Sequence, residues 1–110
     1  MVKLKNKPKQ IAGWEYLIRC LIANEQLDQA LEQTELAYIS TQGKTIFIYY
    51  RSAILFMMKK NEEGLLQLEM ALTKSSKWLN KFVKFYPEII QDPKVTLLIS
   101  QFKKSKKSKN

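Results

Sequence analysis

The fold is decided by residues 46–58, IFIYYRSAILFMM, an apolar stretch that only Arg51 and Ser52 interrupt. These 13 residues are too few to cross a membrane, because a spanning helix needs about 20 apolar residues. A helix that is apolar around nearly its whole circumference has to be buried. Residues 46–58 therefore predict a central helix that neighbouring helices cover on almost every side.

The composition favours helices for the rest of the chain. With 110 residues it is long enough to form one domain with its own core. Its hydrophobic and charged fractions, 45% and 26%, are typical of globular proteins. It has only three glycines and three prolines, whereas an all-β domain needs many tight turns rich in such residues. We therefore expect an all-α fold of helices joined by short connections.

The sequence lacks the residues on which many catalytic and metal sites are built. It has no histidine, and Cys20 is its one cysteine. A thiol nucleophile would therefore lack its usual base, and an ordinary zinc site would lack ligands. A glycine-rich phosphate-binding loop is also absent from the sequence. We expect no catalytic activity, no metal and no cofactor, with Cys20 as a small core residue.

The same features bear on where the protein is found. A single cysteine allows no intrachain disulfide, which is compatible with a reducing compartment. The N-terminal sequence MVKLKNKPKQ is basic, but no uninterrupted apolar segment with a cleavage site follows it. We therefore expect a cytoplasmic protein.

The positive charge is concentrated at the two ends. The net charge is +9, and residues 1–10 contain four lysines while residues 103–110 contain five, so residues 11–102 are neutral. Within this body the first half is acidic, and the C-terminal part is basic because of Lys77, Lys81, Lys84 and Lys94. Short lysine-rich segments cannot bury apolar surface. We therefore expect a disordered basic arm over 1–10 and a disordered Lys/Ser tail over 103–110.

These basic ends have two interpretations. They act as solubilising ends, or they make weak, salt-sensitive contacts with nucleic acid or an anionic membrane surface. Only Arg19 and Arg51 are arginines, whereas the recognition of bases and phosphates by bidentate hydrogen bonds favours arginine. Specific nucleic-acid recognition is therefore the weaker alternative.

Two segments 34 residues apart share one pattern. LDQALEQTELAY (27–38) aligns with NEEGLLQLEMAL (61–72), which places Ala30 over Gly64, Leu31 over Leu65, Thr34 over Leu68 and Ala37 over Ala71. The small residues at the first and last of these positions let one helix approach another closely. An apolar helical stripe also precedes the first copy, formed by Trp14, Leu17, Ile18, Leu21 and Ile22. This spacing predicts two antiparallel helix pairs.

The pattern resembles the tetratricopeptide repeat over residues 11–76. In the first copy, the family's Trp, Leu, Tyr, Ala and Ala positions carry Trp14, Leu17, Leu21, Ala30 and Ala37. The family's Gly, Phe and Pro are replaced by Ile18, Thr34 and Gln42. The second copy matches best when its first helix is slid by one residue, with Tyr49, Ser52, Ala53 and Phe56 in the Trp, Leu, Gly and Tyr places. That slide predicts a turn one residue shorter within the second pair.

Residues 76–102 are similar to the helical segment that closes many bacterial proteins of this family. Their apolar face consists of Trp78, Phe82, Phe85 and Tyr86. Asp92 followed by Pro93 predicts the N-cap and first residue of a last helix. The resemblance implies an α-solenoid of about five to six helices, with repeat 1 over 11–42, repeat 2 over 44–75 and capping helices over 76–102. Solenoids need such caps because the last repeat would otherwise expose its core.

On this resemblance, the first helices of the pairs line a concave groove that binds a peptide or a partner protein. The residues expected to border the groove are Glu15, Arg19, Ile22, Phe47, Tyr50, Asn80 and Lys84. Some members of the family clamp a partner's terminal carboxylate with Lys and Asn at set places on these helices. Glu15 and Arg19 stand there instead, so this clamp is not expected. The resemblance implies a non-catalytic scaffold for protein–protein interaction.

Self-association is a further expectation. The first helix pair opens the array without an obvious polar capping helix, so we expect Trp14, Leu21 and their neighbours to be partly exposed. A homodimer through this N-terminal repeat would cover them. The alternative is that the chain is the terminal part of a longer repeat array.

Overall fold

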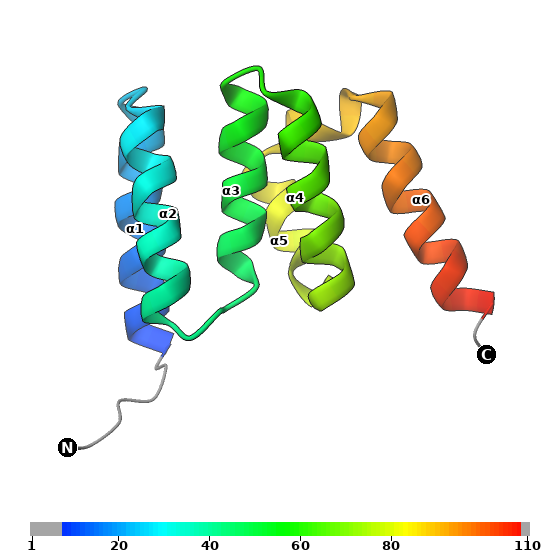
Figure 1. The fold of residues 1–110 in the computed structure, drawn as a ribbon, viewed down its shortest axis with the longest axis horizontal. Coiled ribbons are helices and arrows are strands. Elements are labelled where there is room, and N and C mark those ends of the chain that lie inside the picture. Colours follow the sequence, from blue (N-terminus) through cyan, green and yellow to red (C-terminus); the bar gives the residue numbers. More distant parts are fainter. Residues whose placement is uncertain (1–7, 109–110) are drawn as a thin grey trace.

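A computed structural model describes residues 8–108, which form six α-helices and two short 3-10 helices, with no β-strand among these residues. The α-helices are α1 (Pro8–Ala23), α2 (Leu27–Ser40), α3 (Ile46–Met57), α4 (Asn61–Lys74), α5 (Leu79–Phe85) and α6 (Pro93–Ser108), and the 3-10 helices are η1 (Ser76–Trp78) and η2 (Pro87–Gln91). The first four α-helices pack in sequence as hairpins, α1 on α2, α2 on α3 and α3 on α4 (Figure 1). Over residues 8–108, no helix combines the length and apolar character needed to span a bilayer.

Helix α3 is the predicted central helix. Ten of its 12 residues are buried, and only Arg51 and Met57 are partly exposed. Helices α2, α4 and α5 all pack against it, so the prediction for residues 46–58 is confirmed. Burying each large apolar side chain contributes about 1.5–3 kcal/mol, which makes α3 the largest single contributor to the core.

Small residues lie where the helices approach each other closely. In the two matching segments these buried residues are Ala30, Ala37, Gly64 and Ala71. A Cβ atom at Gly64 would lie only 2.7 Å from Cδ2 of Phe56. The Gly64 carbonyl oxygen also accepts a 2.7 Å hydrogen bond from the Ser52 hydroxyl. Helices α3 and α4 are therefore joined by close packing and by a buried hydrogen bond.

The turns within the two hairpins have the same length and geometry. Residues 24–26 separate α1 from α2, and residues 58–60 separate α3 from α4. In each turn a non-glycine residue has a positive φ, 61° at Glu25 and 69° at Lys59. A residue with positive φ lets the N–H of the next residue donate a hydrogen bond to a carbonyl oxygen in the last turn of the helix. The N–H of Gln26 donates such a bond to the carbonyl oxygen of Leu21. The prediction of a shorter second turn is therefore wrong, because the helix-ending backbone motif repeats at 34 residues although the side-chain match is shifted.

The C-terminal part covers two sides of the second hairpin. Helix α5 packs against α3, and α6 lies beyond α4 with its C-terminal end pointing away from the hairpins (Figure 1). The Asp92 carboxylate accepts a 2.9 Å hydrogen bond from the N–H of Lys94, and Pro93 is the first residue of α6. The predicted N-cap of the last helix is therefore confirmed.

The helical ends differ from the predicted boundaries. Helix α1 begins at Pro8, inside the arm predicted over residues 1–10, and α6 continues to Ser108, inside the tail predicted from residue 103. Proline fits the first turn of a helix. Lysine has good helix propensity, and its charge is favourable near a helix C-terminus. The remaining parts of these two predictions, residues 1–7 and 109–110, lie outside the described residues.

The substitution Gly64→Ala is expected to destabilise the protein. Alanine gains about 1 kcal/mol of helix propensity, but overpacking against Phe56 costs about 1–3 kcal/mol. The free energy of unfolding should therefore fall by roughly 1 kcal/mol. Gly13→Ala is the matched control, because no atom lies within 4 Å of a Cβ there, and it should be stabilising. Urea denaturation of both variants checks this, and an unchanged Gly64→Ala would mean that Phe56 repacks without cost.

Candidate functional site

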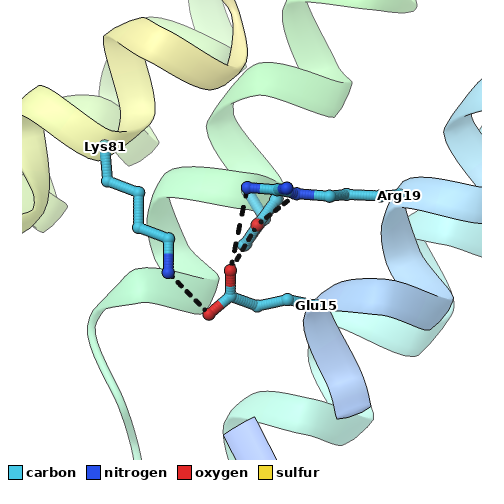
Figure 2. A network of polar contacts seen from close by, with 4 residues as sticks. Glu15, Arg19 and Lys81 are labelled. Carbon is cyan, nitrogen blue, oxygen red and sulfur yellow. Dashed lines mark hydrogen bonds and ion pairs between the residues drawn. The ribbon is translucent and has the colours of Figure 1, made fainter. Parts of the chain in front are cut away.

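A polar network joins three helices at the buried carboxylate of Glu15, which is 8% exposed (Figure 2). The side chains of Arg19 and Lys81, its two cations, are 48% and 42% exposed. Its Oε1 accepts a 2.8 Å hydrogen bond from the hydroxyl of Tyr50 in α3, and its Oε2 accepts a 2.9 Å hydrogen bond from Nζ of Lys81 in α5. Nε of Arg19 donates a 3.0 Å hydrogen bond to the Tyr50 hydroxyl. One carboxylate of α1 is thus bonded to both α3 and α5.

Aromatic contacts close the same region. The Phe85 ring of α5 lies 4.9 Å from the Tyr50 ring, and the guanidinium carbon of Arg19 lies 5.4 Å from the Phe85 centroid. The Phe82 ring, also from α5, lies 5.4 Å from the Tyr49 ring. Helix α5 therefore lies against the side chains of the first helices, α1 and α3, on the side where the peptide groove was predicted.

The predicted groove is consequently not an open surface. Phe47 and Tyr50 are buried, and their rings stack on each other at 6.2 Å. Ile22 is half-buried against the core, while Asn80 and Lys84 are exposed on α5. The structure brings Glu15, Arg19 and Tyr50 together, but as an internal network. The apolar side chains of α5 occupy the place expected for a peptide.

Two contact residues of this region, Lys81 and Phe85, were missing from the predicted site. Lys81 is separated from Glu15 by 66 positions in the sequence, so no local pattern connects them. The contrast between an acidic first half and a basic C-terminal part was the one signal that these regions attract each other.

Burial perturbs the tyrosines of the core. It raises the pKa of the Tyr49 hydroxyl to about 12, and this hydroxyl donates a 2.7 Å hydrogen bond to the Ser75 carbonyl oxygen. Burial, and secondly the hydrogen bond to Glu15, raise the pKa of Tyr50 well above its ordinary range. Both hydroxyls therefore remain protonated donors at neutral pH.

A hollow that is open to solvent lies on a different side of α3. This α2–α4 cleft has a volume of about 220 Å³ and is lined by Thr34, Glu35, Tyr38, Phe47, Ile48, Arg51, Gln67 and Met70. Helix α3 forms its floor, and α2 and α4 form its walls. A water takes up about 30 Å³ of liquid, so the cleft accommodates one or two side chains of a partner rather than a folded domain.

The α2–α4 cleft combines apolar side chains with an arginine–glutamate ion pair. NH1 of Arg51 lies 2.7 Å from Oε2 of Glu35, but Nε of Arg51 is buried and has no hydrogen-bond partner in the described part of the chain. At one end, Nζ of Lys74 lies 5.9 Å from the centroid of the Tyr38 ring. Met70 is 44% exposed on the wall. Arg51 and the exposed apolar surface of Met70 together suit a ligand with a carboxylate and an apolar group.

Neither a metal site nor a known relative identifies the chemistry of this chain. Across residues 8–108, no three His, Cys, Asp or Glu side chains are grouped so that they could hold a metal ion. The chain matches no family model, no curated protein and no solved structure. The geometry offers a closed polar network and an open cleft.

The Glu15 network should appear as an energetic coupling between Glu15 and Tyr50. Glu15→Ala leaves the buried Tyr50 hydroxyl without its acceptor, which costs about 1–3 kcal/mol. A Tyr50→Phe protein has no hydroxyl at this position, so the penalty is absent. The double variant should therefore lose less free energy of unfolding than the two single variants lose together, by about 1 kcal/mol or more. Urea unfolding of the four proteins measures the coupling.

Glu35→Ala is the control for this cycle. Its carboxylate also pairs with an arginine, but the side chain is 49% exposed, so its loss should change the free energy of unfolding by at most about 1 kcal/mol. Strict additivity of Glu15→Ala and Tyr50→Phe would contradict the proposed coupling.

Tyr49 should make the stability of the protein sensitive to alkaline pH. The pKa of Tyr49 is raised from 10.0 to about 12 in the folded state. The contribution of its protonated hydroxyl to the free energy of unfolding is therefore complete below pH 10 and is lost as the pH rises toward 12. The free energy of unfolding should therefore fall more steeply over this range in the wild type than in Tyr49→Phe. Denaturant unfolding at several pH values tests this, and parallel curves would contradict it.

Proposed function

We propose that this chain is a non-catalytic, cytoplasmic protein-interaction module, built from two tetratricopeptide-like helix pairs and a helical cap. It binds an extended segment of a partner protein. The equal turns at Glu25 and Lys59, 34 residues apart, support the repeat interpretation. Because α5 covers the first helices, we place the binding site in the α2–α4 cleft and not in the groove expected from the resemblance.

The observation that carries this proposal is the incompletely paired arginine in the α2–α4 cleft. A guanidinium has five N–H donors, and Glu35 is paired with NH1 at 2.7 Å while Nε has no acceptor among the described residues. A partner carboxylate that displaces Glu35 would accept hydrogen bonds from the guanidinium of Arg51. Met70, which is 44% exposed on the wall of the cleft, would contact an apolar neighbour of that carboxylate.

A second candidate function is contact with nucleic acid or an anionic membrane surface through the basic ends. It is favoured by the position of Lys94, Lys103 and Lys104, which are exposed on α6, while the end of this helix points away from the hairpins (Figure 1). Contacts between exposed charges are screened by salt. Binding in the α2–α4 cleft has an apolar component and should persist at high salt.

Selection from a random peptide library displayed on phage tests the cleft. The selected peptides should be enriched in Asp or Glu beside an apolar residue. Met70→Glu places a negative charge on the wall of the cleft and should weaken their binding by at least about tenfold, which is about 1.4 kcal/mol. Fluorescence anisotropy with a selected, labelled peptide measures this change.

Leu66→Glu is the matched control, because Leu66 is also an exposed apolar residue of α4, at 57%, but does not line the cleft. The Leu66→Glu variant should bind the selected peptide with the same affinity as the wild type. Peptides without acidic residues, or equal losses in the two variants, would contradict the proposed site.

A further inference from the structure

Three lysines share the outward side of η1 and α5. Lys77, Lys81 and Lys84 follow one another at the i, i+4, i+7 spacing of one helix face. Lys77 and Lys84 are exposed and Lys81 is partly exposed, whereas Phe82 on the other side of α5 is buried in the core. Residues 70–87 contain no acidic residue, so these charges are not neutralised within their own segment.

The indole ring of Trp78 brings two of these lysines together. Nζ of Lys77 lies 5.0 Å from the centroid of this ring, and Nζ of Lys81 lies 5.6 Å from it. Each ammonium group is attracted to the ring by a cation–π interaction, but the two like charges repel each other. An anion bound beside the ring would relieve this repulsion and interact with both lysines.

The Glu15 network adds a cation from another helix. Figure 2 shows Arg19 of α1 and Lys81 of α5 directed at the carboxylate of Glu15. This carboxylate is buried, whereas both cations are about half exposed. The network therefore presents an excess of positive charge to the solvent.

The cations of α1 and α5 form one continuous surface. The guanidinium carbon of Arg19 lies 5.4 Å from the centroid of the Phe85 ring, and Phe85 follows Lys84 in the chain. Among residues 8–108, neither Lys77 nor Lys84 forms an ion pair with a carboxylate. We call Arg19, Lys77, Lys81 and Lys84 the α1–α5 cation surface.

The character of this surface indicates which polyanion it suits. A helix that binds a membrane surface inserts exposed apolar side chains, but no large apolar side chain between residues 71 and 89 is exposed. Separated lysines contact the phosphates of a nucleic-acid backbone as point charges, without reading the bases. Trp78 is partly exposed between two of these lysines. An aromatic ring among cations is typical of surfaces that bind single strands, because unpaired bases stack on it.

We propose that the α1–α5 cation surface binds single-stranded nucleic acid without sequence preference. The backbone phosphates lie along Lys77, Lys81, Lys84 and Arg19, and one base stacks on the Trp78 ring. This inference is independent of the α2–α4 cleft. It also uses a surface different from the basic ends, because the cations belong to the packed helices α1 and α5 and to η1.

Fluorescence anisotropy of the full chain with a labelled oligothymidylate tests the inference. The logarithm of the affinity should fall linearly with the logarithm of the salt concentration, with a slope of about −0.7 for each phosphate contacted. The double variant Lys77→Gln/Lys84→Gln removes two contacts, so binding at low salt should weaken by at least about tenfold and the slope should shrink by about 1.4. Both lysines are exposed and outside the Glu15 network, so circular dichroism should show an unchanged fold.

Lys94→Gln/Lys103→Gln is the matched control, because it removes the same charge from two exposed lysines of α6. This variant should bind the oligothymidylate like the wild type. Polyglutamate and vesicles containing phosphatidylserine should not compete with the oligothymidylate. A wild type that does not bind, equal losses in the two double variants, or effective competition would overturn the inference and would leave peptide binding in the α2–α4 cleft unaffected.

The fluorescence of Trp78 gives a second measurement that needs no lysine variant. The chain has two tryptophans, so Trp14→Phe leaves Trp78 as the only one. A base that stacks on this ring should quench its fluorescence as the oligothymidylate is added. A reducing agent is included, because Cys20, predicted as a core residue, is half-buried and its thiol can be oxidised. Unchanged fluorescence at saturation with oligothymidylate would overturn the inference.

Discussion

The enclosure of α3 is the constraint on which the rest of the structure depends. Ten of its 12 residues are buried, so a single neighbouring helix cannot cover it. The chain meets this demand from three directions, with α2 and α4 on its flanks and α5 across its remaining side. Small residues such as Ala37 and Gly64 permit the close approach that this enclosure requires. The order of the hairpins follows from the need to surround one helix.

The position of α5 then determines which surfaces are left for recognition. A buried carboxylate is costly unless it is paired, and Glu15 is bonded to donors from α3 and α5. This pairing, together with the packing of Phe82 and Phe85, places α5 over the first helices. The side that would form a peptide groove becomes core. The α2–α4 cleft stays open, on a side of α3 that α5 does not cover.

The class of fold was predictable because its signals are local. The apolar run at 46–58 and the Asp92-Pro93 helix start each depend on residues close together in the sequence. The 34-residue spacing is a repeat of one local pattern, and all three features have structural counterparts. The site was less predictable. Phe47 and Tyr50 were expected to line a groove, but both are buried. The Phe85 ring that lies against Tyr50 comes from α5, about one third of the chain further on. In the sequence, Arg51 is an interruption of an apolar run and one of two arginines, and neither feature predicts the cleft.

The amino-acid sequence by itself determined the helices, their pairing and the identity of the buried one, since hydrophobic periodicity and small-residue spacing act over one or two turns of helix. It also determined that charge collects at the ends. Only the tertiary structure decided which faces are covered, because this depends on contacts such as Lys81 with Glu15, 66 positions apart. The Glu15 network and the open cleft at Arg51 are therefore properties of the packing, because each depends on which distant element lies beside it.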